Sequence, residues 1–279
     1  MKFWKMQSAG NDYVYVDIRG EKTQADWPAV ARLVSDRHFG IGSDGLVLLT
    51  EAGAGDCGMR IFNADGSEGS MCGNALCCIG RFLYEREQEE GRKEYWIETA
   101  AGLRIVQADR AECGVAVRVN MGSIRVEPRP VAVYLRRRMA AYRADAGNPH
   151  LVLFCGIPNA AEAEQFGRRL QKNSRYPDGC NVEFCEVLAR DCMQVLVWER
   201  GSGRTLACGS GAASVFAAGR MLGLVDARVR MRMPGGELSL SEENGEVWLS
   251  GPAQTVFEGT CSPENCIPGR SFVSSGRRE

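Results

Sequence analysis

Hydrophobic and polar positions alternate along many short stretches of this chain, and a period of two residues predicts β-strands. The alternation begins at Phe3–Met6 and resumes at Tyr13–Asp17, after the turn Gly10-Asn11-Asp12. Similar short strands are predicted at 46–49, 59–62, 95–98, 103–107, 115–119, 131–135, 151–154, 182–187, 194–199, 228–233, 237–240, 247–250 and 255–258. We therefore expect a protein rich in sheet.

Four segments have instead the spacing of apolar residues that is typical of helices. They cover residues 28–36, 73–87, 160–172 and 209–222. The second and the fourth of these are apolar nearly all round, and a helix without a polar face is buried. The simplest arrangement places each of these two helices inside a curved, mostly antiparallel sheet.

The two buried helices are preceded by similar sequences. Met71-Cys-Gly-Asn-Ala75 leads into the first helix, and Ala207-Cys-Gly-Ser-Gly211 leads into the second, with the two cysteines 136 residues apart. Nine residues before these cysteines stand Asn63 and Glu199, respectively. Such an internal repeat predicts two similar units, each of which presents one cysteine at a helix N-terminus.

The predicted fold class is therefore α/β (α+β), with two pseudo-symmetric domains, each a curved, mostly antiparallel sheet around a central apolar helix. The N-terminal domain is expected over residues 1–122 and the C-terminal domain over residues 123–254. Residues from about 255 to 279 are expected to return to the N-terminal domain.

Composition narrows the classes of function. The chain has 34 basic and 35 acidic residues, a net charge of −1, and so balanced a charge does not attract nucleic acid or an anionic membrane. Its apolar runs are much shorter than the roughly 20 residues of a membrane-spanning helix. With only two histidines among its residues, the chain cannot form a multi-histidine metal site. We expect a protein without a metal and without a cofactor.

Cysteine is abundant, with 12 residues, but without the spacing Cys-x-x-Cys that zinc and redox sites use. The first residues, Met1 to Asp12, also have no apolar stretch like that of a signal peptide. We therefore expect a cytoplasmic protein with reduced cysteines, most of which pack in the core.

Cys72 and Cys208 differ from the other cysteines because each would stand at the start of a helix. Unpaired backbone N–H groups and the helix dipole stabilise an anion there, and we expect them to lower the pKa of both thiols. Two thiols facing one carbon suit a proton transfer in which a thiolate removes the α-proton of an amino acid and a thiol returns a proton on the opposite face. The N–H groups of both helices would stabilise the carbanion that forms.

Several further motifs resemble diaminopimelate epimerases, over residues 1 to about 260 and in the same order. They are Ser8-Ala-Gly-Asn-Asp12, Gly40-Ile-Gly-Ser-Asp-Gly45, Phe62-Asn-Ala-Asp-Gly-Ser-Glu68, Gly147-Asn-Pro-His150, Asn181-Val182 and Glu199-Arg-Gly-Ser-Gly203, together with the two cysteine motifs. The resemblance implies a cofactor-independent isomerase that converts L,L-diaminopimelate to meso-diaminopimelate for lysine and peptidoglycan synthesis. It also implies two pseudo-symmetric domains that close over the substrate.

The same resemblance implies a role for each matching residue. Cys72 and Cys208 would be the acid and base, with His150 and Glu199 beside the reacting carbon. The residues that would bind the substrate are Asn11, Asn63, Gly73, Asn74, Asn148, Asn181, Arg200, Gly209 and Ser210. The expected partner is a small amino-acid substrate, and the chain could also pair as a homodimer.

Three positions depart from the pattern of the family. Leu76 replaces an arginine, Arg204 replaces a glutamate in Gly-Glu-Thr, and Gly179-Cys180 replaces a basic residue and a threonine before Asn181. Because these changes leave the two cysteines in place, an alternative is a racemase of another amino acid, such as histidine, on the same scaffold. A more remote alternative is a non-enzymatic thiol or zinc-binding protein.

Overall fold

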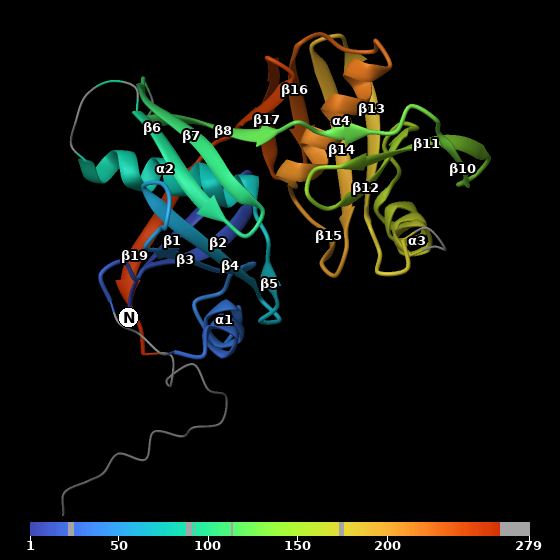
Figure 1. The fold of residues 1–279 in the computed structure, drawn as a ribbon. Coiled ribbons are helices and arrows are strands. Elements are labelled where there is room, and N and C mark those ends of the chain that lie inside the picture. Colours follow the sequence, from blue (N-terminus) through green and yellow to red (C-terminus); the bar gives the residue numbers. More distant parts are fainter. Residues whose placement is uncertain (22–24, 88–90, 92, 113, 173–175, 263–279) are drawn as a thin grey trace, which may run out of the picture.

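The chain folds into two halves, each of which curves a sheet around one helix (Figure 1). The computed structural model describes residues 1–21, 25–87, 91, 93–112, 114–172 and 176–262. Most strand pairs are antiparallel, as predicted from the sequence; the parallel pairs are β2–β3, β4–β6, β12–β13 and β14–β16. The α/β (α+β) fold class is thereby confirmed.

The first half runs from β1 to β9. Its elements are β1 (Lys2–Ser8), β2 (Asn11–Asp17), α1 (Trp27–Ser35), β3 (Gly45–Thr50), β4 (Cys57–Asn63), β5 (Glu68–Gly69), α2 (Gly73–Glu87), β6 (Lys93–Thr99), β7 (Gly102–Ala111), β8 (Gly114–Gly122) and β9 (Arg125–Val126). The helix α2 packs against β1, β7, β8 and β19.

The second half runs from β10 to β19. Its elements are β10 (Val131–Tyr134), β11 (Arg138–Asp145), β12 (Pro149–Phe154), α3 (Ala160–Gln171), β13 (Asn181–Ala189), β14 (Cys192–Glu199), β15 (Gly203–Arg204), α4 (Gly209–Met221), β16 (Arg228–Met233), β17 (Gly236–Glu243), β18 (Glu246–Ser250) and β19 (Gln254–Thr260). The helix α4 packs against strands of the same half, among them β11, β12, β13 and β17.

The two halves have the same strand order. In the first half, the pair β1–β2 is antiparallel, β2–β3 is parallel, β3–β4 and β4–β5 are antiparallel, and β4–β6 is parallel. In the second half, the pairs β11–β12, β12–β13, β13–β14, β14–β15 and β14–β16 have the same directions in the same order. The helices α1 and α3 occupy equivalent positions, as do α2 and α4. The internal repeat in the sequence is therefore a repeat of the fold.

The last strand of each half pairs with a strand of the other half. The strand β9, which follows β8, pairs with β11, and β19, which follows β18, pairs with β1. The strands β8 and β18 also pair with each other, so that one hydrogen-bonded sheet runs through both halves. The predicted domain bounds of 1–122 and 123–254 stay a prediction, and residues 263–279 lie outside the described residues.

Burial explains why α2 and α4 have no polar face. Nearly all side chains of α2 from Gly73 to Tyr84 are buried, and so are nine residues of α4, from Gly209 to Gly219. The largest core cluster contains Ile79 of α2 and Phe216 of α4. The outer helices α1 and α3 each cover a separate, smaller cluster of apolar side chains.

The outer helices begin with the capping residues that short helices commonly use. Asp26 caps α1 by accepting a hydrogen bond from the Ala29 N–H, and Pro28 stands in the first turn. Asn159 and Glu162 form a capping box at the start of α3. Local sequence thus fixes where these helices begin.

Candidate active site between two helix N-termini

The N-termini of α2 and α4 meet in the middle of the molecule. A Cβ atom on Gly209 would lie 3.5 Å from the Cα of Gly73 and 3.6 Å from the backbone N of Asn74, and 3.3 Å from the Leu249 side chain. The backbones of the two helix starts therefore lie close together at these two glycines. The sequence prediction that one cysteine stands at the start of each helix is confirmed, because Cys72 and Cys208 directly precede these glycines.

Cys208 caps the N-terminus of α4. Its backbone is extended, its carbonyl accepts a hydrogen bond from the Ala212 N–H, and its sulfur accepts one from the Gly211 N–H at 3.4 Å. The hydroxyl of Ser210 lies 3.5 Å from the same sulfur. The Cys208 sulfur is thus held among polar groups of the first helical turn.

Cys72 has an equivalent position at α2. Its carbonyl accepts a hydrogen bond from the Leu76 N–H, and backbone groups of Ala75 and Asn74 hydrogen-bond its sulfur. The thiol donates to the Asn11 Oδ1 over 3.5 Å. The Tyr13 side chain also hydrogen-bonds the sulfur. Cys72 therefore contacts a predicted substrate-binding residue and a tyrosine that the sequence analysis did not single out.

The predicted lowering of both thiol pKa values is wrong for this structure. Burial raises the pKa of Cys72 to about 11, and the nearby backbone N–H groups only partly oppose that rise. The pKa of Cys208 is also raised, first by burial and next by the carboxylate of Glu199. Both groups are therefore thiols at neutral pH when no substrate is present.

The raised pKa of Cys72 predicts how fast this thiol is alkylated. Only the thiolate reacts, so labelling of Cys72 by iodoacetamide should rise about tenfold per pH unit between pH 7 and pH 10. Mass spectrometry of the peptide that contains Cys72 measures this rate, and the cysteines of the unfolded chain serve as the reference. A rate that reaches a plateau near pH 8 would contradict the raised pKa.

Glu199 lies beside Cys208. Its carboxylate accepts hydrogen bonds from the Thr205 hydroxyl and from the Cys208 thiol. Burial raises the pKa of Glu199, and these two hydrogen bonds partly oppose the rise. The contact of Thr205, which follows the departure at Arg204, was not predicted from the sequence.

His150 is the second residue of β12, and it stands opposite Asn181, the first residue of the neighbouring strand β13. The His150 Nε2 lies 2.9 Å from the Asn148 Oδ1. The Asn181 Oδ1 accepts a hydrogen bond of 2.8 Å from the Arg200 N–H, and so fixes the backbone beside Glu199. Four predicted residues of the second half are thus linked in pairs.

Asn74 is buried but has no hydrogen-bond partner for its side chain. It is 1% exposed, and neither amide atom finds a partner within the described part of the chain. Leaving a buried polar group unpaired costs about 1–3 kcal/mol. An incoming carboxylate would satisfy the amide Nδ2, and this supports the predicted role of Asn74 as a donor to substrate.

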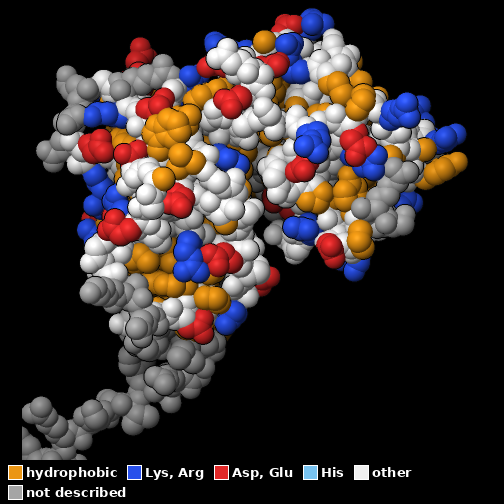
Figure 2. Space-filling model, viewed as in Figure 1, with side chains coloured by type: hydrophobic (Ala, Val, Ile, Leu, Met, Phe, Trp, Pro, Cys, Tyr) orange, Lys and Arg blue, Asp and Glu red, His pale blue; other side chains and the backbone are white. Residues whose placement is uncertain are grey.

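A cavity of about 660 Å³ opens between the two halves, where Figure 2 shows the surface hollowed. Asn11 and Asn63 of the first half and Glu199 and Arg200 of the second half lie on its wall. Asn63 is exposed there and donates to the Ser67 hydroxyl over 2.9 Å. Cys72 and Cys208 are not among the described residues that line this cavity.

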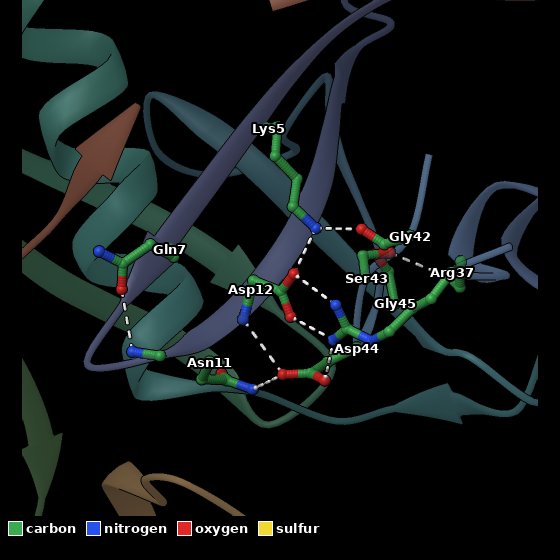
Figure 3. A network of polar contacts seen from close by, with 11 residues as sticks. Lys5, Gln7, Asn11, Asp12, Arg37, Gly42, Ser43, Asp44 and Gly45 are labelled. Atoms are coloured by element: carbon green, nitrogen blue, oxygen red, sulfur yellow. Dashed lines mark hydrogen bonds and ion pairs between the residues drawn. The ribbon is translucent and has the colours of Figure 1, made fainter. Parts of the chain in front are cut away.

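A network of charged side chains holds Asn11 in place (Figure 3). Asp44 accepts from the Asn11 Nδ2 over 2.9 Å and also pairs with Arg37. Asp12 pairs with Arg37 and with the buried Lys5. Asp44 thereby turns the amide oxygen of Asn11 toward Cys72. This role of Asp44 was not predicted from the sequence, although Asp44 stands within the motif Gly40–Gly45.

The geometry suits acid–base chemistry at a carbon next to a carboxylate. Two thiols stand at two helix N-termini that supply N–H donors from opposite halves of the molecule. Within the described ranges, no group of three His, Cys, Asp or Glu side chains could hold a metal ion. Among those residues, no helix is both long enough and apolar enough to cross a membrane.

Comparison with models of known protein families shows to which family the chain belongs. The model of the family "Diaminopimelate epimerase" matches residues 3–127 and 142–256, which include both cysteine motifs. The chain belongs to the diaminopimelate epimerase family. It is accordingly an isomerase.

Curated members of the diaminopimelate epimerase family are similar over nearly their whole length. The diaminopimelate epimerase of Carboxydothermus hydrogenoformans is 40% identical over 274 residues, which cover 93% of this chain and 98% of that protein. That of Methanococcus maripaludis strain C6 is 36% identical over 275 residues, which cover 93% of this chain and 99% of that protein.

Solved structures share the fold at low sequence identity. A predicted epimerase from Pseudomonas aeruginosa has a TM-score of 0.73 at 15% identity, covering 93% of this chain and 98% of that chain. A probable proline racemase from Agrobacterium radiobacter K84 has a TM-score of 0.71 at 16% identity, covering 94% and 92% of the two chains. These structures support the architecture of the family, and they do not identify a substrate.

Proposed function

We propose that this protein converts L,L-diaminopimelate to meso-diaminopimelate by proton transfer between two cysteines. The observation that carries the proposal is the meeting, at Gly73 and Gly209, of two helix N-termini that a cysteine directly precedes in each case. Membership of the diaminopimelate epimerase family supports the substrate. The wider role would be in lysine and peptidoglycan synthesis, in the cytoplasm.

In this mechanism the α-carboxylate of the substrate binds the N–H groups at both helix starts. Asn74 and Ser210 stand directly after the two glycines and add side-chain donors. One cysteine, as thiolate, takes the α-proton, and the thiol of the other cysteine gives a proton to the opposite face of the carbon. The helix N-termini stabilise the negative charge that develops on the carboxylate side.

The base must lose its own proton when the substrate binds, because both thiols have a raised pKa without substrate. The substrate ammonium group brings a positive charge next to the sulfurs, and a nearby positive charge favours a thiolate. Glu199 hydrogen-bonds the Cys208 thiol and is placed to take up its proton. Desolvation therefore keeps the thiols neutral until the substrate arrives.

The distal end of diaminopimelate would bind in the cavity between the halves. Asn63 and Arg200 line this cavity from opposite halves. The Arg200 guanidinium is exposed and has no ion-pair partner within the described residues, so it is free to bind a second carboxylate. A carboxylate and an ammonium group at the distal end distinguish diaminopimelate from monocarboxylic amino acids such as histidine.

Exchange of α-protons in heavy water tests the substrate. The protein is incubated separately with L,L-diaminopimelate, lysine, histidine and proline, and loss of the α-proton signal is followed by NMR. We expect the fastest exchange with L,L-diaminopimelate and little with lysine, which lacks the distal carboxylate. Faster exchange with histidine or another monocarboxylic amino acid would contradict the proposed substrate and support the alternative racemase.

Two further expectations from the sequence stay predictions. They are the cytoplasmic location and the pairing of two chains as a homodimer. Size-exclusion chromatography with light scattering on the purified full chain measures the mass of the assembly.

A further inference from the structure

A buried carboxylate stands behind His150 and has no place in the mechanism above. Glu183 is on β13 and His150 is on the neighbouring strand β12, and both side chains are fully buried. The Glu183 Oε1 lies 2.7 Å from the His150 Nδ1. The two side chains therefore form a close hydrogen-bonded pair without access to water.

The Glu183 carboxylate also faces the first turn of α4. A Cβ atom on Gly211 would lie 3.0 Å from the Glu183 Oε1. The other oxygen, Oε2, has no hydrogen-bond partner among the described residues. A buried carboxylate is costly unless a partner compensates its charge, and here the compensating groups are the histidine ring and the positive end of the helix dipole.

This contact determines which nitrogen of His150 carries a proton. An ionised carboxylate only accepts hydrogen bonds, so the Nδ1 of His150 must be the donor. The second nitrogen, Nε2, lies 2.9 Å from the amide group of Asn148, which the family resemblance places in the substrate site. With the proton on Nδ1, Nε2 is an acceptor, so the Asn148 amide must present its Nδ2, and not its Oδ1, to the ring. The ring consequently turns Nε2, and not Nδ1, toward Asn148.

We propose that Glu183 is a positioning residue that keeps a proton on Nδ1 of His150 and so fixes Nε2 as the nitrogen that serves the substrate site. When Nε2 takes a proton, the ring becomes a cation that the Glu183 carboxylate stabilises, and loss of that proton restores the neutral ring. The inference rests on the proposed function, in which His150 lies beside the reacting carbon.

The histidine content of the chain allows a direct test by ¹⁵N NMR. The chain has two histidines, and His38 is exposed, so it serves as the internal reference. Protonated and unprotonated ring nitrogens have different ¹⁵N shifts, and His38→Gln assigns the His150 signals. In the full chain without substrate, we expect Nδ1 of His150 to be protonated.

Two substitutions at Glu183 separate the hydrogen bond from the charge. Glu183→Leu removes the acceptor at Nδ1, whereas the Asn148 amide can turn its Oδ1 to accept at Nε2, so we expect the proton to move to Nε2. Glu183→Gln keeps an oxygen that can accept, so the proton should stay on Nδ1. Glu186→Gln is the matched control, because Glu186 is exposed on the same strand.

The kcat for L,L-diaminopimelate should fall in the variant in which the His150 proton leaves Nδ1. Glu183→Leu should lower kcat at least about 10-fold, within the limit of about 10⁴-fold that one positioned proton-transfer group contributes, with KM little changed. Glu183→Gln should lose less, and Glu186→Gln should match the wild type. A smaller loss with Gln than with Leu is the rescue that a positioning role requires.

Three outcomes would overturn the inference. They are an unprotonated Nδ1 in the wild-type chain, a proton that stays on Nδ1 in Glu183→Leu, and an unchanged kcat in Glu183→Leu. The wild-type spectrum keeps the test decisive even if Glu183→Leu does not fold. If the proton moves as expected but the wild type exchanges no α-proton, the position of the proton on His150 is supported and the proposed function fails.

Discussion

Replacing Cys72 or Cys208 by alanine should abolish epimerisation. Each direction of the reaction needs one thiolate and one thiol, and the structure supplies one cysteine at each of two opposed helix starts. We expect each single variant to lose more than the about 10²–10⁴-fold that one general acid or base typically contributes. The measurement is kcat with L,L-diaminopimelate.

Cys192→Ala is the matched control for these variants. Cys192 is buried on β14 and stands outside the two cysteine motifs, so its replacement tests whether loss of a buried thiol alone affects turnover. We expect this control to keep the wild-type kcat. Near-normal turnover of Cys72→Ala would contradict the mechanism with two thiols.

Replacing Arg200 by alanine should strongly lower kcat/KM for L,L-diaminopimelate. The exposed Arg200 guanidinium lines the cavity, where it is placed to bind the distal carboxylate. A hydrogen bond to a charged group is worth about 1.5–3 kcal/mol, which corresponds to a loss of about 10-fold to 150-fold in kcat/KM. Steady-state kinetics with L,L-diaminopimelate give this ratio.

Lysine provides the decisive comparison for Arg200. Because lysine has no distal carboxylate, its slow reaction should be the same in the wild type and in Arg200→Ala. Arg168→Ala is the control variant, because Arg168 is exposed on α3, pairs with Glu164 and is not among the residues that line the cavity. An equal loss of kcat/KM for lysine and for diaminopimelate would show that Arg200 does not bind the distal carboxylate.

Much of the fold could be predicted from the sequence because the strongest patterns are local. The prediction of a helix over 73–87 matches α2, and the second buried helix, predicted over 209–222, ends one residue earlier. The repeat of Cys-Gly at the two helix starts predicted where the halves meet. Apolar periodicity and a repeated motif sufficed for these elements.

The strand β11 was missed for a physical reason. Residues Arg138–Asp145 contain three alanines and two arginines, and alanine favours a strand only weakly. The two-residue strands β5, β9 and β15 were also missed, because two residues cannot display a period.

Asp44 and Glu183, which support residues of the site, were not predicted from the sequence, because their contacts depend on how the strands are paired. Asp44 reaches Asn11 across 33 residues, and Glu183 reaches His150 across the same sequence separation. The signal for Glu183 was available, since it is an acidic residue inside the buried run Asn181–Cys185. The pKa prediction failed because it considered the helix dipole and omitted burial, which dominates at both cysteines.

The position of deuterium after reaction in heavy water tests the central claim most directly. A thiol exchanges its proton with solvent, so the returning group delivers deuterium to the opposite face of the carbon. Early in the reaction, we expect deuterium at the inverted carbon of meso-diaminopimelate and almost none in the remaining L,L-diaminopimelate. Deuterium that enters both isomers equally from the start would contradict a mechanism in which two cysteines work on opposite faces.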